Sequence, residues 1–282
     1  MEFKYINTNN DICSDDINTL FPNWEAGKEN LCVFSPHDDD ALIGAGYAIK
    51  AAQKNGAEVY VFIFCSGNAG YSKPEQRESI VDIRKDETVK AYAELGVKEE
   101  NIIRFDFCDF TALRYIGWKL DEDRDGSFKL FITALRKFKI TRVLVPNHYR
   151  EHIDHTAVYC IGAYDSPQAG DPVVVDWGEP NAVKSVAEYS VWADFSPEDA
   201  LVEGRPVRAN RIVVTDEQCE GIIQKAIKHY ESQGEIIKGL VKSRQDRRIQ
   251  NGMYMELYIL FDPRPKLDFK QYKNYLSERN LL

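Results

Sequence analysis

The stretch VFSPHDDD at residues 33–40 decides the fold of this chain of 282 residues, because it joins an apolar run to a charged turn. The run ends in His37, followed by Asp38, Asp39 and Asp40, and the segment ALIGAGY at residues 41–47 continues with helix-like spacing. Three adjacent carboxylates repel one another and are costly to hold at the buried end of a strand. A bound cation removes that cost. The stretch therefore predicts a strand, a metal-binding turn and a helix in direct succession.

Strand-like and helix-like segments alternate after residue 30. The run EVYVFIFC at residues 58–65 is almost continuously apolar, which is typical of a strand covered on both faces. Repeated strand–helix units of this length indicate right-handed crossovers. We therefore expect an α/β fold with a Rossmann-like, open, mostly parallel sheet and helices on both faces. The predicted strands are 31–35, 58–65, 102–107 and 142–145, and the predicted helices are 41–55, 73–95 and 127–138.

The second half of the chain has a less regular pattern. A helix is predicted over residues 215–233, because Thr215 or Asp216 can cap it. We expect one domain over residues 1–282, with a polar lead-in at 1–30 that holds one short helical piece, and an irregular insertion at 165–210. Further strands are predicted at 173–176, 190–193, 211–214 and 253–260.

The composition excludes several classes of protein. A net charge of −9 and a pI near 5.2 argue against nucleic acid as the main partner. No apolar run approaches the roughly 20 residues that a transmembrane helix needs. The six cysteines form no CxxC pair, so neither a zinc ribbon nor a dithiol redox motif is indicated. We expect a reduced, cytoplasmic protein; the sequence leaves both a monomer and a homo-oligomer open.

Four of the five histidines follow the ends of two predicted strands. His37 follows the first strand, and His148, His152 and His155 come directly after the fourth. Ligand sites of open α/β sheets lie outside the carboxyl ends of the strands, where the strand order reverses. If the strand order is 3-2-1-4, these two segments face each other. The sequence then predicts a metal site at the carboxyl ends of the strands.

Two histidines and one carboxylate with open positions form a zinc-type catalytic set. Residues three apart at a strand-to-helix junction return to the same side of the first turn, which favours His37 and Asp40 as one pair of ligands. The third ligand is then His152 or His155. A lone histidine at a strand end is usually a core or capping residue, and aspartates before a helix are usually N-caps. Two such segments in matching positions favour a metal.

At these residues the chain resembles the PIG-L/LmbE-like family of metal-dependent N-deacetylases, which includes the N-acetylglucosaminyl-phosphatidylinositol de-N-acetylases. The family's His-Pro-Asp-Asp motif and its Gly-containing helix match PHDDDALIGAG at residues 36–46. The second family motif, which ends in Asp-His, matches HIDH at 152–155. The intervening Arg-x-x-Glu helix matches RKDE at 84–87, and Leu-Gly follows at 95–96.

The resemblance implies a role for each matching residue. His37, Asp40 and His155 would hold one zinc ion per chain. Asp39 would be the general base that activates the attacking water, and His152 would stabilise the oxyanion or protonate the leaving amine. In addition, Arg84 would contact the substrate.

Three residues leave alternatives open. Asp38 stands where the family has proline, so we expect another contact to hold the turn, such as Asp38 bonding to backbone N–H groups or to Arg84. Arg150 either assists at the oxyanion or is a surface residue. Asp154 either orients His152 or caps the helix that begins near His155.

These residues together support hydrolysis of an amide. Zinc can lower the pKa of a bound water to about 7 and polarise a carbonyl, and a carboxylate beside it can take the proton. We expect removal of an N-acetyl or other N-acyl group from a small molecule, with an amino sugar as the default substrate. The alternatives are a non-catalytic α/β module that binds a metal or a small ligand, and an inactive family member. No GxGxxG or Walker-type loop follows the first strand to support nucleotide binding.

Overall fold

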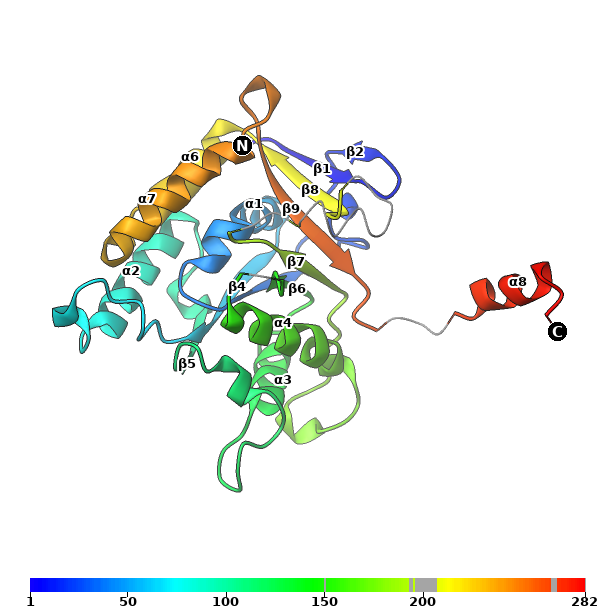
Figure 1. Ribbon diagram of the computed structural model, residues 1–282, viewed down its shortest axis with the longest axis horizontal. Coiled ribbons are helices and arrows are strands. Elements are labelled where there is room, and N and C mark those ends of the chain that lie inside the picture. Colours follow the sequence, from blue (N-terminus) through cyan, green and yellow to red (C-terminus); the bar gives the residue numbers. More distant parts are fainter. Residues whose placement is uncertain (150, 193–194, 196–206, 265–267, 282) are drawn as a thin grey trace.

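A single mixed sheet of nine strands forms the centre of the protein in a computed structural model, which describes residues 1–149, 151–192, 195, 207–264 and 268–281 (Figure 1). The strand order is β2-β1-β8-β9-β7-β6-β3-β4-β5. The strands are β1 (Phe3–Asn7), β2 (Ile12–Ser14), β3 (Asn30–Ser35), β4 (Glu58–Cys65), β5 (Ile102–Phe107), β6 (Arg142–Pro146), β7 (Ser185–Tyr189), β8 (Arg211–Thr215) and β9 (Tyr254–Phe261).

Helices cover both faces of this sheet, as predicted. The helices α1, α2 and α6 share one core with the sheet, and α3 and α4 share the other (Figure 1). The helices are α1 (Asp40–Lys54), α2 (Ile80–Glu94), α3 (Ser127–Lys137), α4 (Ile153–Asp165), α6 (Glu217–Ile227), α7 (Gly234–Ser243) and α8 (Lys270–Glu278). No helix in the described part of the chain is long and apolar enough to cross a membrane.

The predicted order of the first four strands is confirmed. The segment β5-β4-β3-β6 is the predicted 3-2-1-4 arrangement, and all of its neighbours pair in parallel. The strands β3 and β6 are adjacent, so the turns after their carboxyl ends lie at the same edge of the sheet. This adjacency brings the segment 37–40 next to the segment 152–155.

The expectation of a mostly parallel sheet is only partly met. Strands β7, β6, β3, β4 and β5 are parallel, but the pairs β1/β2, β1/β8, β8/β9 and β7/β9 are antiparallel. Within the expected lead-in at 1–30, the structure has the strands β1 and β2, of which β2 lies at the edge of the sheet, in addition to a 3-10 helix at Ile17–Thr19. These strands have five and three residues and are too short to stand out in a sequence.

Several predictions for the second half are wrong. Residues 175–177 form a 3-10 helix where a strand was expected at 173–176. The strand β7 ends at Tyr189, before the expected strand at 190–193, of which residue 193 lies outside the described part. The predicted helix 215–233 ends at Ile227, although Asp216 caps it as expected. Of the expected insertion at 165–210, residues 193–194 and 196–206 are not described; the rest contains 3-10 turns and β7.

The helix α1 packs unusually close to the sheet, and this closeness sets its position below the turn. A Cβ atom at Gly44 would lie 2.4 Å from the Tyr189 ring and 2.6 Å from the Ser190 carbonyl oxygen. The glycine therefore allows α1 to approach the end of β7. The helix also kinks at Ala45, where φ is −130°. The freed N–H of Tyr47 donates to Glu256 at 2.8 Å.

Candidate metal centre

The three carboxylates of the turn between β3 and α1 lie in three different environments. Asp38 is fully buried and points to the neighbouring helix α2, Asp40 is 2% exposed, and the Asp39 side chain is 13% exposed. The Asp39 side chain makes no cap bond at the start of α1, so it is not the ordinary N-cap that aspartates before helices often are. The three residues therefore have different roles despite their identical chemistry.

Asp38 is part of the frame that holds the turn. Its carboxylate accepts hydrogen bonds from Arg84 Nε at 2.8 Å and Thr88 Oγ1 at 3.0 Å, and it also pairs with Arg104. Burial raises the pKa of Asp38, but the two guanidinium groups outweigh it and hold the pKa below its usual value. The predicted contact with Arg84 is present. A buried, doubly paired carboxylate thus replaces the fixed φ that a proline would supply.

Two tyrosines fix the backbone of the same residue. The Asp38 carbonyl oxygen accepts hydrogen bonds from Tyr92 Oη at 3.0 Å and from Tyr230 Oη at 2.7 Å. Tyr92 lies in α2 and Tyr230 lies just after α6, so α2 and the segment that follows α6 both anchor the turn. The carboxylates of the turn are held in place by contacts on both side chain and backbone.

His37, Asp40 and His155 form a compact group at the carboxyl ends of β3 and β6. Asp40 Oδ2 lies 3.1 Å from His37 Nδ1 and 3.2 Å from His155 Nε2. One ligand atom from each of the three residues lies within 4.8 Å of the others. These are the residues that the resemblance implies as zinc ligands. The structure therefore brings together the two segments that are 115 residues apart in the sequence.

The chemistry of His155 fits a cation. Its Nδ1 lies 2.8 Å from Glu151 Oε2, so this nitrogen carries the proton in the neutral imidazole. The unprotonated Nε2 is then buried, accepts no hydrogen bond from the described residues, and faces the Asp40 carboxylate. Two electron-rich atoms at 3.2 Å repel each other unless a positive charge lies between them. A divalent metal satisfies both, because imidazole nitrogen and carboxylate oxygen are common zinc ligands.

The pKa values of His155 and His37 also indicate that this site favours a positive charge. Burial lowers the pKa of His155, but Asp40 and Glu151 outweigh it and raise the pKa to about 9. Burial also lowers the pKa of His37, whereas its contacts with Asp154 and Asp40 raise it to about 10. The carboxylates that favour a proton on these rings would also favour a metal ion between them.

Two other groups of potential ligands occur, and each is already committed to other contacts. Asp109 accepts the N–H groups of Gly67 and Ala69, and burial raises the pKa of its neighbour Cys65, which disfavours a thiolate. His152 and Asp154 also lie near His37, but His152 Nδ1 accepts the Asp154 N–H at 3.1 Å. The group of His37, Asp40 and His155 is therefore the best candidate among the described residues.

Asp39 lies beside this group and keeps its carboxylate available. Among the described residues, the Asp39 side chain makes one polar contact, with the Arg84 guanidinium Nη2 at 3.5 Å. Burial raises the pKa of Asp39, with Arg84 opposing it and the Asp40 and Asp38 carboxylates adding to it. A carboxylate with a raised pKa is a better proton acceptor, as a general base requires.

His152 lies at the opposite side of the centre. Its ring meets His37 edge-on at 4.9 Å between centroids and contacts Phe110 at 4.6 Å. Because Nδ1 accepts the Asp154 N–H, Nε2 carries the hydrogen of the neutral ring. Burial and the neighbouring His37 lower the pKa of His152. A neutral ring with a free N–H is a hydrogen-bond donor.

The main contacts of the Asp154 side chain are neither with His152 nor with the start of α4, the two roles that were expected. Its carboxylate accepts the N–H groups of Phe110 at 2.7 Å and Ala112 at 3.2 Å, and it lies 3.4 Å from His37 Nε2. The N-cap of α4 is His152. Asp154 thus connects the loop after β5 to a metal-site histidine.

Glu151 is a functional residue that the sequence did not reveal. Oε2 contacts His155 Nδ1, and Oε1 accepts the N–H groups of Val191 at 2.9 Å and Trp192 at 3.1 Å. Such carboxylates set the orientation and tautomer of a ligating histidine. Glu151 precedes His152, the extended N-cap of α4, so helical spacing gave no signal for this contact.

The remaining predicted residues have different positions. Arg84 is 4% exposed and lies behind Asp38 and Asp39, under Gly67 and Gly70, where an added Cβ would come within 2.8 Å of its side chain. Its contact with a substrate stays a prediction. Arg150 lies outside the described residues. His148 pairs with Glu188 at 2.7 Å and stacks on Tyr159.

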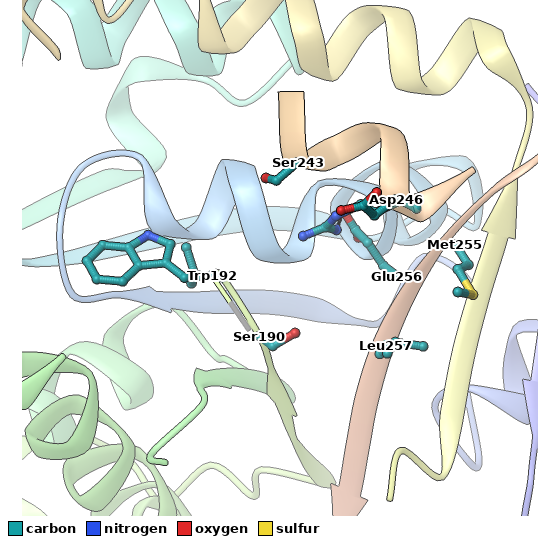
Figure 2. Close-up of a pocket in the computed structure, with 9 residues that line it drawn as sticks. Ser190, Trp192, Ser243, Asp246, Met255, Glu256 and Leu257 are labelled. Atoms are coloured by element: carbon teal, nitrogen blue, oxygen red, sulfur yellow. Dashed lines mark ion pairs between the residues drawn. The ribbon is translucent and has the colours of Figure 1, made fainter. Parts of the chain in front are cut away.

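A pocket of about 340 Å³ lies next to the centre on the β7 side. Figure 2 shows Trp192 at one end and the residues from the 3-10 helix Arg244–Arg247 and from β9 at the other. The Trp192 ring lies 5.5 Å from the His155 ring and 6.1 Å from the His152 ring. The residues that line the pocket are Ser190, Val191, Trp192, Ser243, Asp246, Arg247, Met255, Glu256 and Leu257.

Residues 32–163, which contain all of these predicted ligands, match the family model described as PIG-L, GlcNAc-PI de-N-acetylase. The match covers slightly less than half of the chain. The predicted resemblance to PIG-L/LmbE-like N-deacetylases is confirmed. A curated relative, the diacetylchitobiose deacetylase of Thermococcus kodakarensis, is 27% identical over 171 residues, which are 57% of this chain. The match spans 60% of the length of that relative.

Solved structures resemble this chain over more than residues 32–163. The N,N'-diacetylchitobiose deacetylase of Pyrococcus horikoshii superposes with a TM-score of 0.64 and 19% identity, covering 88% of each chain. The 4-carboxy-2-hydroxymuconate hydratase GalB of Pseudomonas putida also reaches 0.64 at 19% identity, covering 85% of this chain and 99% of its own. Since a hydratase and a deacetylase share the fold, the fold alone does not specify the reaction.

Proposed function

We propose that this protein is a zinc-dependent hydrolase that removes an N-acetyl group from a small N-acylated amino sugar. The observation that carries the proposal is the buried Nε2 of His155, which makes no hydrogen bond with the described residues and faces Asp40 at 3.2 Å, with the carboxylate of Asp39 beside them. The family match and the deacetylase relatives support this chemistry.

His37, Asp40 and His155 would hold the metal. When bound, zinc would polarise the amide carbonyl and lower the pKa of water. The three protein ligands leave coordination positions for water and substrate, as in catalytic zinc sites.

Side chains around the centre would transfer the protons of the reaction. Asp39 accepts a proton from the attacking water, and its raised pKa suits this task. Its position is set by Arg84, which the buried Asp38 holds in turn. The hydrolysis consumes one water and releases acetate and the amine, so the proton taken by Asp39 leaves on the amine nitrogen.

His152 would act on the substrate oxygen. Its neutral ring has a free Nε2–H, which can donate to the oxyanion that develops on the amide carbonyl. The lowered pKa keeps the ring neutral near pH 7, so donation to the oxyanion is favoured over the alternative role as the acid for the leaving amine.

Release of amine from an N-acetylglucosamine derivative by zinc-loaded protein tests the proposal. Asp39→Asn should retain stoichiometric metal and lose roughly 10²–10⁴-fold in amine release, the usual contribution of a general base. The exposed Asp123→Asn is the matched control and should change neither quantity. Protein that binds metal but releases no amine from any N-acyl sugar would support a non-catalytic binding module instead, and protein that binds no metal would contradict the proposal.

A further inference from the structure

The C-terminal helix α8 carries an apolar stripe that the rest of the described chain does not cover. Phe269, Tyr272 and Leu276 recur with the spacing i, i+3 and i+7, which places them along one side of the helix. Phe269 and Tyr272 are 58% and 70% exposed, and no residue of α8 is buried. Figure 1 shows α8 standing away from the sheet and the other helices. A helix of nine residues is marginal alone, so this stripe needs a surface to pack on.

The tail that carries α8 is basic, whereas the rest of the protein is acidic. Residues 264–282 contain five basic and two acidic side chains, which give +3 in a chain of net charge −9. The other residues together therefore carry −12. A basic helix is attracted to an acidic protein surface, whereas nucleic acid and anionic lipid repel so acidic a body. The charges favour a surface of this same protein as the partner of α8.

A surface of the matching kind lies at residues 171–180, which we call the acidic loop. Valine usually lies in protein cores, but in this loop Val173 and Val175 are 50% and 61% exposed. The charged residues of the loop are all acidic: Asp171, Asp176 and Glu179. Exposed apolar groups beside carboxylates complement a basic amphipathic helix in both charge and polarity.

Contacts from below hold the acidic loop in one conformation. Arg136 is 4% exposed and donates to five backbone carbonyl oxygens at 2.8–3.1 Å, four of them in the loop. Between the two exposed valines, Val174 has a φ of 43°, which a β-branched residue rarely adopts. Strain of this kind persists where the surroundings impose it and is common where proteins bind a partner or ligand. The loop therefore presents Val173 and Val175 in a fixed arrangement.

The basic tail leaves the body of the protein beside this loop. Arg264 Nη2 lies 2.5 Å from Asp171 Oδ2, six positions before the first residue of α8. A two-fold axis near this ion pair would bring α8 of each copy to the acidic loop of the other. Such an exchange uses the same surfaces twice and closes on itself, so it gives a dimer and not a filament.

We propose that the protein forms a symmetric dimer in which α8 of each copy packs on the acidic loop of the other. The apolar stripe of the helix covers Val173 and Val175. Lys270 and Lys273, at the edge of the stripe, lie near the carboxylates of the loop. The dimer does not depend on the proposed reaction. A helix folded back on its own chain and a helix lying on an anionic membrane are the alternatives that the experiment separates.

The mass of the full chain in solution, measured by light scattering over a range of concentrations, tests the dimer. We expect the unsubstituted protein to dimerise. The double variant Lys270→Glu, Lys273→Glu should weaken dimerisation by about tenfold or more, because an acidic helix then faces an acidic loop. Asp176→Lys, Glu179→Lys should have a similar effect, because helix and loop are then both basic. All four side chains are exposed, so the core stays intact.

A pair of single substitutions tests the apolar stripe. Tyr272→Ser removes a ring from the stripe and should also weaken the dimer. Asn274→Ser is the matched control, because Asn274 is equally exposed but lies on the opposite side of α8. It should leave the dimer unchanged.

An equimolar mixture of the two charge-reversed variants separates exchange from the alternatives. Each helix of a mixed dimer meets a loop of opposite charge, so the mixture should dimerise although neither variant does so alone. A monomeric unsubstituted protein, or a dimer that none of these substitutions weakens, would overturn the proposal. So would a mixture that stays monomeric, since mixing cannot rescue a helix packed on its own chain. Binding to phosphatidylserine vesicles that Lys270→Glu, Lys273→Glu abolishes, without any dimer, would assign α8 to a membrane surface instead.

Discussion

The two ends of the parallel strands each hold a buried cluster of charges, and the clusters differ in whether their atoms are satisfied. At the amino ends, the Glu29 cluster comprises Glu29, Thr141, Arg142 and Lys184. At the carboxyl ends, the Asp40 cluster comprises His37, Asp40, Glu151 and His155. Both are built from side chains that lie far apart in the sequence. Only one of them needs a further positive charge.

The Glu29 cluster is complete in itself. The fully buried Arg142 contacts both oxygens of Glu29, at 3.0 Å and 3.1 Å, and donates to the carbonyl oxygens of Pro22 and Asn23. Glu29 also accepts from Thr141 and Lys184. Each donor has an acceptor, so no ligand is required. A network of this kind stabilises and specifies structure.

The Asp40 cluster leaves His155 Nε2 unpartnered among the described residues and directs it at a carboxylate. The contrast shows how to separate structural from functional buried charges: a structural cluster satisfies its own donors and acceptors, and a binding cluster leaves one atom for a ligand. The predictions that follow test this distinction.

The largest effect is expected when the unpartnered atom is removed. His155→Ala should lose stoichiometric zinc and reduce amine release by roughly 10³-fold or more, since the ligand set is broken. Elemental analysis and the amine assay measure both. His148→Ala is the matched control, because His148 follows the same strand but pairs with Glu188 away from the centre. Loss of metal in both variants would mean that the ligand set is misassigned.

Breaking the complete cluster should affect stability and leave the metal centre unchanged. Arg142→Met leaves Glu29 buried without its main partner and should lower the free energy of unfolding by about 3–5 kcal/mol. Lys184→Met removes a half-exposed partner of the same carboxylate and should cost less than about 1 kcal/mol. Denaturant titration measures both. Equal small losses would show that the cluster contributes little to stability.

A smaller effect is expected from the carboxylate behind His155. Glu151→Gln keeps an oxygen for the N–H groups of Val191 and Trp192 but replaces the charge beside Nδ1. Zinc affinity should fall by about 10–100-fold, the usual effect of a carboxylate behind a ligating histidine. Competition with a chromophoric chelator measures this. Glu188→Gln, beside His148, is the control and should leave zinc affinity unchanged.

The smallest effect concerns pH. Burial raises the pKa of Glu29, but Arg142, Lys184 and Thr141 outweigh it and lower the pKa to about 2, from 4.5. A lowered pKa in the folded state gives stability that is present above about pH 4.5 and is lost as pH falls towards 2. In Glu29→Gln this part of the acid dependence should disappear, so its free energy of unfolding should change less between pH 4.5 and 2. An unchanged slope would contradict the lowered pKa.

The sequence alone favoured the strand order around the site and the pairing of His37 with Asp40, and left His152 or His155 as the third member. The apolar runs that become β3 and β6 each end in histidines and aspartates, and parallel crossovers must place such ends at one edge. The departure from the family's proline predicted that Asp38 would hold the turn through backbone N–H groups or through Arg84, and the structure has the contact with Arg84. Local pattern failed for β7, because the strand SVAEY carries Ser185 and Glu188 at buried positions and has no apolar run. The strands β1 and β2 were missed because they are short and carry no continuous apolar run.

Only the tertiary structure decided which partners each of the three aspartates contacts. Asp38 is neutralised by Arg84 and Arg104 from α2 and β5, whereas Asp40 faces His155 from α4. The roles of Glu151 and Trp192 likewise depend on contacts between the segment after β6 and the segment after β7. A pKa and a ligand role depend on which charges lie within a few ångströms. The sequence specifies the functional group of each residue, and the fold determines which other groups lie next to it.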